Sequence, residues 1–273
     1  MAGNGYLDFA QEKHLSFVFR APNQFQVTRL GNFDQYSLNY EQERFEVQLV
    51  DGNYQISQLL EQGRLARAAA FTVRNAQWEM QVSHSLPRFN PDIDYISTAI
   101  LSRRISKNWT LGGAAIQKQF SERGFSYIAS GRARFESRFF QINTELAGSH
   151  WEGNEDWGGS LEMNARHRNF TMGATALYAG PNFAGFFSNS LIVTGNVNYR
   201  LDKLSFGGGI NYRNNYLLDD INLDRSILNT NLAFKVGNHE LGGFIGYNIF
   251  RNTINERDFY ATATYRYTMG TPI

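Results

Sequence analysis

The sequence predicts an all-β protein built from long antiparallel strands, and three features predict it. Apolar and polar residues alternate with a period of two through most of the chain, which is typical of strands and not of helices. Short turn-forming pairs separate the alternating segments. The composition combines 15% aromatic residues with 25 glycines and only 5 prolines, which suits many strands joined by tight turns.

The alternation is cleanest after residue 94. In residues 190–200, the odd-numbered Leu191, Val193 and Val197 are apolar, and the even-numbered residues between them are mostly polar. The same pattern recurs in Tyr36–Tyr40, Phe45–Leu49, Trp78–Val82, Phe125–Phe135, Trp157–Arg166, Phe170–Tyr178, Leu204–Arg213, Leu228–Val236 and Phe259–Tyr267. Residues 55–70 fit either a short helix or an inward-folded segment. Counting the alternating segments predicts about 16 strands, within a range of about 12 to 18.

The connections are expected to alternate between tight turns and longer links, as in consecutive hairpins. The expected tight turns are Glu136-Ser137, Arg168-Asn169, Asp202-Lys203 and Gly237-Asn238. The expected polar links are 150–156, 180–189, 214–225 and 251–258. Four prolines are expected to lie between strands, because proline is excluded from paired strand interiors: Pro22, Pro87, Pro91 and Pro181.

Strand length and aromatic placement favour a membrane-spanning sheet. A tilted strand of about 11 residues rises roughly 28 Å, close to the apolar band of about 25 Å in outer-membrane barrels. Aromatic residues gather at strand ends, where rings suit lipid–water boundaries. This aromatic girdle comprises Phe125, Phe135, Phe170, Tyr178, Tyr199, Tyr212, Tyr247, Phe250, Phe259 and Tyr267.

Closure follows from the membrane interpretation. A sheet in lipid must satisfy every backbone group internally, so it must close. The sequence therefore predicts a closed antiparallel transmembrane β-barrel of about 16 strands. The alternative is a soluble β-sandwich, solenoid or ligand-binding barrel, whose apolar face would point inwards.

Composition excludes several other classes. A net charge of +1 argues against nucleic-acid binding, which needs a basic excess. The absence of cysteine excludes disulfides, thiol catalysis and cysteine-based metal sites. There is no apolar run of 18 residues for a spanning helix, and no basic-then-apolar leader. We expect residues 1–273 to form a single transmembrane barrel domain, and whether it is excised from a longer protein stays open.

The polar faces of the strands carry a set of charged and amide residues that would line the lumen. The candidates are Arg132, Arg134, Glu145, Glu162, Arg166, Arg200, Asn211, Arg213, Lys235 and Arg266. One interpretation is a pore lining that sets solute selectivity. The other is a self-paired ladder of charges that fills a narrow barrel. The basic excess in the set favours anions if the pore is open.

The alternating segments Ser190–Arg200, Leu204–Arg213, Asn229–Val236 and Phe259–Tyr267 resemble those of the bacterial outer-membrane β-barrel superfamily, and porins in particular. The resemblance implies an integral location in the outer membrane of a Gram-negative-type bacterium, contact with lipid, and passage of small solutes or ions. The chain departs from it at the end: such barrels usually finish on an aromatic residue, whereas this chain finishes Tyr-Thr-Met-Gly-Thr-Pro-Ile.

A second, local resemblance covers Phe45–Phe71. A strand, an Asp-Gly turn and a Gly-Arg segment there are similar to an early section of fimbrial ushers and related secretion barrels. This resemblance implies the pore domain of a translocon, with a translocated protein as the partner. A structural or adhesive surface barrel is a further alternative.

Enzyme motifs are weak. A membrane phospholipase barrel would offer His-x-Ser-Asn-Gly, which is absent, and the nearest protease-like residues are Asp219, Asp220, His239 and Glu240. We interpret these as ordinary loop residues and expect no enzyme, cofactor or metal site. Trp151, Trp157 and the aromatic-glycine run 183–187 either bind sugars or partners or pack loops into the barrel mouth, and we favour packing.

Overall fold

The computed structural model describes residues 2–20, 35–62, 64–88, 90, 92–217, 221–251 and 255–268. Within these ranges the chain forms 17 strands that belong to one antiparallel sheet. The strands are β1 (Ala2–Tyr6), β2 (Lys13–Arg20), β3 (Gln35–Gln42), β4 (Phe45–Tyr54), β5 (Arg64–Arg74), β6 (Trp78–Pro87), β7 (Ile93–Arg104), β8 (Trp109–Phe120), β9 (Gly124–Glu136), β10 (Phe140–Trp151), β11 (Asn154–His167), β12 (Phe170–Ala179), β13 (Ser190–Arg200), β14 (Leu204–Leu217), β15 (Ile221–Val236), β16 (His239–Arg251) and β17 (Asn255–Tyr267). The predictions of an all-β antiparallel fold and of its strand number are confirmed.

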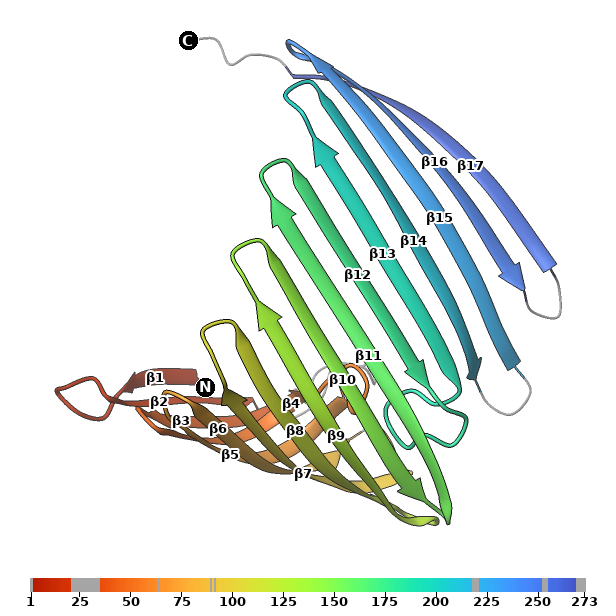
Figure 1. The fold of residues 1–273 in the computed structure, drawn as a ribbon. Helices are drawn as coiled ribbons and strands as arrows, with labels where there is room; N and C mark the ends of the chain where they lie inside the picture. Colours follow the sequence, from red (N-terminus) through yellow and green to blue (C-terminus); the bar gives the residue numbers. More distant parts are fainter. Residues whose placement is uncertain are drawn as a thin grey trace, which may run out of the picture. The chain divides into compact units, whose positions relative to one another are not determined.

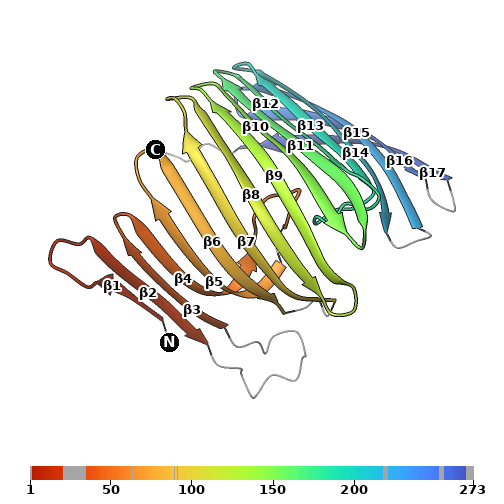
Figure 2. The ribbon, with the colours of Figure 1, turned by 60° about the horizontal axis from the view of Figure 1, so that its bottom comes forward.

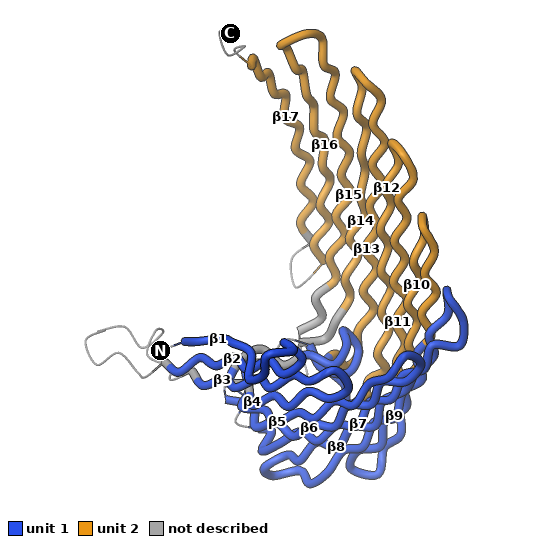
Figure 3. Tube along the Cα trace, turned by 90° about the vertical axis from the view of Figure 1, so that its left-hand side faces the viewer, with its two compact units in different colours: residues 1–132, 147–156, 184–186 blue, residues 133–146, 157–183, 187–273 orange. Residues whose placement is uncertain are grey.

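The sheet divides into two compact units (Figure 3). Unit 1 comprises residues 1–132, 147–156 and 184–186, and unit 2 comprises residues 133–146, 157–183 and 187–273. In the part of the chain that the structure describes, no helix has the length and apolar character needed to cross a membrane.

In unit 1, strands β1 to β8 pair in sequence order (Figure 2). The two faces of these strands differ in the way the alternation predicts. On β8, Trp109 and Leu111 are exposed, whereas Ala114, Ile116 and Lys118 are buried. Large apolar side chains are therefore exposed on one face of β8, whereas its buried face combines apolar residues with a lysine.

In unit 2, strands β11 to β17 form a series of long hairpins (Figure 1). Here too, the large apolar side chains are exposed: Leu232 is 52% exposed, Leu241 59% and Phe259 69%. Their partners across the ladders belong to the same face, since Leu232 pairs with Gly243 and Phe206. A continuous apolar outer surface of this kind is suited to contact with lipid.

The strands are longer than the sequence suggested, and most of the predicted polar links shrink. Between β10 and β11, only Glu152 and Gly153 remain outside strands, with φ values of 51° and 78°. Positive φ at both residues is the geometry of a two-residue hairpin turn. The acidic residues that suggested a loop at 150–156 thus lie mainly in strands. The link at 180–189 stays irregular, as predicted.

The other two links are also shorter than predicted. β14 extends to Leu217 with β15 beginning at Ile221, and β16 extends to Arg251 with β17 beginning at Asn255. Pro87 is a further correction, because it is the last residue of β6, opposite Ala66, instead of lying between strands. Proline is tolerated there because the ladder ends at that point. Pro22 and Pro91 lie outside the described residues.

Residues 55–70 do not form a helix. Residues 55–62 fold into a tight segment with a bridge between Ser57 and Glu61, and the alanine run belongs to β5. Asp51 and Gly52 do not form the expected turn, because β4 continues through them to pair with Arg67 and Ala66. The ladder pairing outweighs the local turn preference of Asp-Gly.

Candidate functional site

The predicted lumen residues lie on the face of the strands opposite the exposed apolar residues. In β14, for example, Asn211 pairs with Thr194, while the neighbouring Ile210 pairs with Gly195 on the other face. The set is distributed as Arg132 and Arg134 on β9, Glu145 on β10, Glu162 and Arg166 on β11, Arg200 on β13, Asn211 and Arg213 on β14, Lys235 on β15, and Arg266 on β17. We call this side the polar face. That it lines a passage stays a prediction.

On unit 2, arginines gather on the polar face at the tight-turn ends of β11 to β14. Arg166, Arg168 and Arg200 line a hollow of about 410 Å³. Asn198 and Asn231 line the same hollow. Guanidinium groups beside amides form a set of donors suited to a small anion.

Several charges of the polar face contact one another or neighbouring amide groups. Arg134 Nη2 lies 2.9 Å from Glu136 Oε2. The Glu162 carboxylate accepts hydrogen bonds from Asn143 at 3.2 Å and from Asn164 at 3.1 Å. The ladders also place Lys235 and Arg266 opposite Glu240 on its two sides. The structure thus combines elements of the paired ladder with an arginine-lined hollow.

On unit 1, a buried lysine joins two loops to the polar face. Lys118 Nζ lies 3.0 Å from Glu61 Oε1, and the two side chains are 1% and 0% exposed. The same ammonium donates to the carbonyl oxygens of Ala184 at 2.8 Å and Gly185 at 3.2 Å, and lies 3.5 Å from that of Leu60. We call these five residues the Lys118 clasp.

Further backbone bonds hold the two loops, which are residues 55–62 and 184–186. Phe186 N donates to Leu59 O at 3.1 Å, and Ala184 N donates to Ser149 Oγ at 3.1 Å. Leu59 and Leu60 are fully buried. Lys118 lies on the same face of β8 as Ala114 and Ile116. The two loops contact Lys118, so they cover this face, which is the polar face of unit 1.

The Lys118 clasp is absent from the sequence predictions, which left residues 55–70 unassigned and did not single out Lys118. One signal was available in the sequence. Lys118 follows Ala114 and Ile116 at every second position, and a lysine that is buried on the same face as these residues needs a partner. The packed-loop interpretation agrees with the burial of Phe183, which is 2% exposed. Trp157 instead lies on the apolar face, 56% exposed and 4.7 Å from the Tyr178 ring.

Nine of the ten girdle residues lie on the apolar face, and Phe250 does not. Tyr247 pairs with Leu228 on the apolar face, whereas Phe250 pairs with Arg225. Arg225 in turn pairs with Arg213 on the polar face. Residues 247 and 250 are an odd number apart, so a regular strand cannot place both on one face.

The protease-like residues do not come together in the described part of the chain. Asp219 and Asp220 lie outside the described residues. His239 and Glu240 begin β16 directly after a tight turn, and His239 Nδ1 lies 2.7 Å from the Tyr265 hydroxyl. Among the described residues, no group of three or more His, Cys, Asp or Glu side chains could hold a metal ion.

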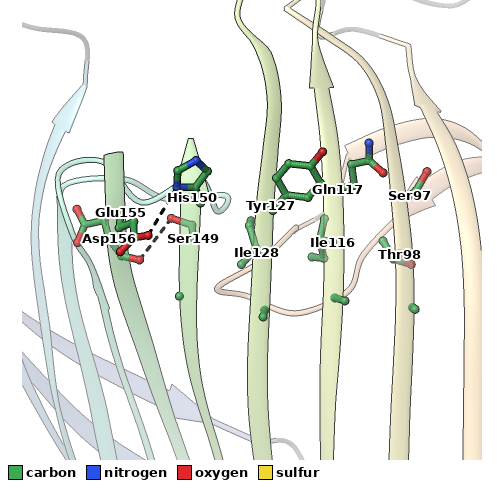
Figure 4. A pocket seen from close by; sticks show the side chains of 14 residues that line it. Ser97, Thr98, Ile116, Gln117, Tyr127, Ile128, Ser149, His150, Glu155 and Asp156 are labelled. Carbon is green, nitrogen blue, oxygen red and sulfur yellow. Dashed lines mark hydrogen bonds and ion pairs between the residues drawn. The ribbon is translucent and has the colours of Figure 1, made fainter. Parts of the chain in front are cut away.

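A hollow of about 760 Å³ on unit 1 is lined by His150, Glu155 and Asp156 and by two serines, of which Ser149 is adjacent to His150 in the sequence (Figure 4). His150 Nδ1 lies 3.8 Å from Glu155 Oε1, but Ser149 Oγ donates to Asp156 O at 3.5 Å. Ser149 is buried and His150 is exposed, as expected for neighbours on opposite faces of a strand. The serine and histidine therefore cannot act as a nucleophile–base pair.

No protein-family profile matches the chain, and no curated protein is similar to it in sequence. Solved structures match it over nearly its whole length. The matches include Wzi, an outer-membrane protein of Escherichia coli involved in group 1 capsule assembly and described as a carbohydrate-binding β-barrel (TM-score 0.56, 10% identity, 93% of this chain and 77% of that chain).

Two further structures give similar agreement. The outer-membrane protein OpdK from Pseudomonas aeruginosa matches with a TM-score of 0.54 at 12% identity, covering 97% of this chain and 87% of that chain. A BenF-like porin from Pseudomonas fluorescens Pf-5 matches with a TM-score of 0.54 at 8% identity, covering 98% and 87%. These matches show that the chain has the fold of the bacterial outer-membrane β-barrels.

Proposed function

We propose that the protein is an outer-membrane channel that passes small solutes with a preference for anions. In this proposal the sheet closes on itself, because an unpaired strand edge in lipid would leave backbone groups without hydrogen-bond partners. The apolar face then contacts lipid, and the polar face surrounds the passage. The observation that carries the proposal is this division of the sheet into an exposed apolar face and a polar face rich in arginine.

The anion preference rests on the charges of the predicted lining. Seven of the ten lining residues are basic and two are acidic. In addition, the 410 Å³ hollow concentrates Arg166, Arg168 and Arg200 at one end of unit 2. Rings of basic side chains favour anions in pores.

The Lys118 clasp favours small solutes over a translocated protein. Two loops packed against the polar face of unit 1 reduce the space available on that face. The clasp is a buried ion pair with additional backbone acceptors, so moving the loops would leave charges without partners. A pore for a folded or extended protein would need this space to be free.

The experiment is a planar-bilayer recording with the purified protein. We expect discrete conductance steps and, in a KCl gradient, a reversal potential that reports anion preference. The double variant Arg166→Gln/Arg200→Gln should shift that potential towards zero, because two positive charges leave the passage. Arg103→Gln is the matched control, since Arg103 stacks over Trp78 on the apolar face at 4.7 Å. An absence of conductance from correctly folded protein would overturn the proposal.

A further inference from the structure

Asparagine and glycine alternate across neighbouring strands on the polar face of unit 2, where β11 to β15 lie side by side (Figure 1). Directly opposed residues form rows across these strands, and the side chains of one row share a face of the sheet. From β11 to β15, one row reads Asn164, Gly173, Asn196, Gly209 and Asn229. The next row towards the tight turns reads Arg166, Thr171, Asn198, Gly207 and Asn231. We call these two rows the asparagine rows.

The glycines make room for the amide groups. A Cβ atom added to Gly207 would meet the Oδ1 atoms of both Asn198 and Asn231, its neighbours on either side. A Cβ atom added to Gly173 would lie 2.7 Å from Oδ1 of Asn196, closer than real Cβ contacts come. The amides therefore lie over backbone that only glycine leaves uncovered. Because Asn196, Asn198 and Asn231 are exposed, these residues stay accessible to a solute on the polar face.

The asparagine rows line two adjoining hollows. Asn198 and Asn231 line the hollow of about 410 Å³. Asn164 and Asn196 line a second hollow of about 390 Å³. Arg166 belongs to the lining of both hollows, so the two adjoin. Together they form one polar concavity with two compartments.

Positive charge is concentrated in one of the two compartments. Arg166, Arg168 and Arg200 all line the hollow of about 410 Å³, and no acidic residue is among the described residues that line it. The other hollow contains both Glu136 and Arg138, so its charges are mixed. The concavity therefore has a cationic compartment with amides beside it.

Amide and guanidinium groups recognise different parts of one solute. An amide both donates and accepts hydrogen bonds, which matches a hydroxyl group, because a hydroxyl does the same. A guanidinium only donates, and its planar fork matches a carboxylate through two parallel hydrogen bonds. A simple anion would use the arginines and leave the amides unused, whereas a neutral sugar would do the reverse. Only a solute that combines a carboxylate with several hydroxyl groups uses the whole concavity.

We propose that these two hollows form a binding site for a hydroxyl-rich carboxylate of the sugar-acid class. Its carboxylate contacts the guanidinium groups of Arg166, Arg168 and Arg200, and its hydroxyl groups contact the amides of the asparagine rows. The inference deepens the proposed channel by naming a class of solute, and it rests on that proposed function for the passage of the solute. Binding itself requires only the polar face of unit 2.

Isothermal titration calorimetry of the detergent-solubilised full chain tests the site without requiring conduction. Glucuronate is the probe. The matched comparisons are glucose, which lacks the carboxylate, and cyclohexanecarboxylate, which lacks the hydroxyl groups. We expect glucuronate to bind about fivefold more tightly than cyclohexanecarboxylate and roughly tenfold more tightly than glucose, because neutral hydrogen bonds contribute less than those to a charged group. Equal affinities for glucuronate and either comparison would overturn the proposal.

The paired change Asn198→Ala/Asn231→Ala removes two amides at exposed positions. It should weaken glucuronate binding about fivefold and leave cyclohexanecarboxylate binding unchanged. Gly207→Ala displaces the same two amides and should give the same pattern. Gly208→Ala is the matched control, because Gly208 is on the opposite face and its added Cβ would meet the carbonyl oxygen of Asn229 at an ordinary 3.5 Å. Unchanged glucuronate binding in folded Asn198→Ala/Asn231→Ala protein would overturn the proposal.

Binding and conduction are measured separately, so the site and the channel fail separately. Protein that binds glucuronate as expected but gives no conductance would overturn the channel and support the site. Protein that conducts anions but binds glucuronate no more tightly than cyclohexanecarboxylate would overturn the site and leave the channel standing. Heat-dependent migration in gels establishes beforehand that each variant is folded.

Discussion

The ammonium group of Lys118 lies 3.0 Å from the carboxylate of Glu61, and both side chains are almost completely buried. Lys118 belongs to the sheet, whereas Glu61 belongs to the segment between β4 and β5. The pair therefore attaches a connection to the polar face of the sheet. The carbonyl groups of Ala184 and Gly185 complete the surroundings of the ammonium.

Lys118→Met should destabilise the protein and widen the passage. The change removes the ammonium group that faces the buried Glu61 carboxylate, and breaking a buried ion pair by removing one member typically costs about 3–5 kcal/mol. Unfolding in urea should show the loss, and bilayer recordings should show larger or noisier conductance. Lys107→Met, in the exposed turn between β7 and β8, is the control. Unchanged conductance in a folded Lys118→Met protein would contradict a role for the clasp in narrowing the passage.

The absence of cysteine allows the loop position to be probed chemically. Leu60→Cys places a thiol at a fully buried position, so maleimide labelling of the folded protein should be slow. Adding Lys118→Met should accelerate labelling, because the loop then leaves the sheet more often. Glu122→Cys, in an exposed turn, should label rapidly in both backgrounds. Equal labelling of Leu60→Cys with and without Lys118 would show that the clasp does not hold the loop.

The apolar face should be in direct contact with lipid. Trp157 is 56% exposed on that face, whereas Trp151 stacks on Phe120 with ring centroids 4.9 Å apart. In reconstituted vesicles, brominated lipids should quench a variant retaining only Trp157 more strongly than one retaining only Trp151. The same quenching in both variants would argue against the assignment of the two faces.

The two-residue turn between β10 and β11 depends on Gly153. At a φ of 78°, a residue with a Cβ is strained even though nothing lies within 4 Å of the added atom. Gly153→Ala should therefore cost about 1 kcal/mol of unfolding free energy. Gly148→Ala is the matched control, because its Cβ also meets nothing within 4 Å and the backbone is ordinary strand. Equal effects of the two changes on urea unfolding would contradict this explanation.

The sequence by itself determined which face most residues occupy. In the strands, Leu191 and Phe259 are exposed residues of odd number and Arg200 has the opposite parity, because side-chain direction in a strand depends only on sequence parity. Phe250 and Tyr247 differ in parity, so β16 directs them to opposite faces. Parity also explains a mean hydropathy of −0.42 in a protein with an exposed apolar face, since every other strand residue is polar.

Only the tertiary structure decided the connections. The continuation of β4 through Asp51 and Gly52 depends on ladder pairing that the local Asp-Gly turn preference opposes. The strands β10 and β11 extend to a two-residue turn at Glu152 and Gly153 where the sequence predicted a longer link. The Lys118 clasp joins residues from three distant parts of the chain, so no local pattern contains it. Each strand pair has its own register, and the registers of successive pairs together decide which distant residues meet. The contacts of Lys118 with Glu61 and Ala184 are decided in this way.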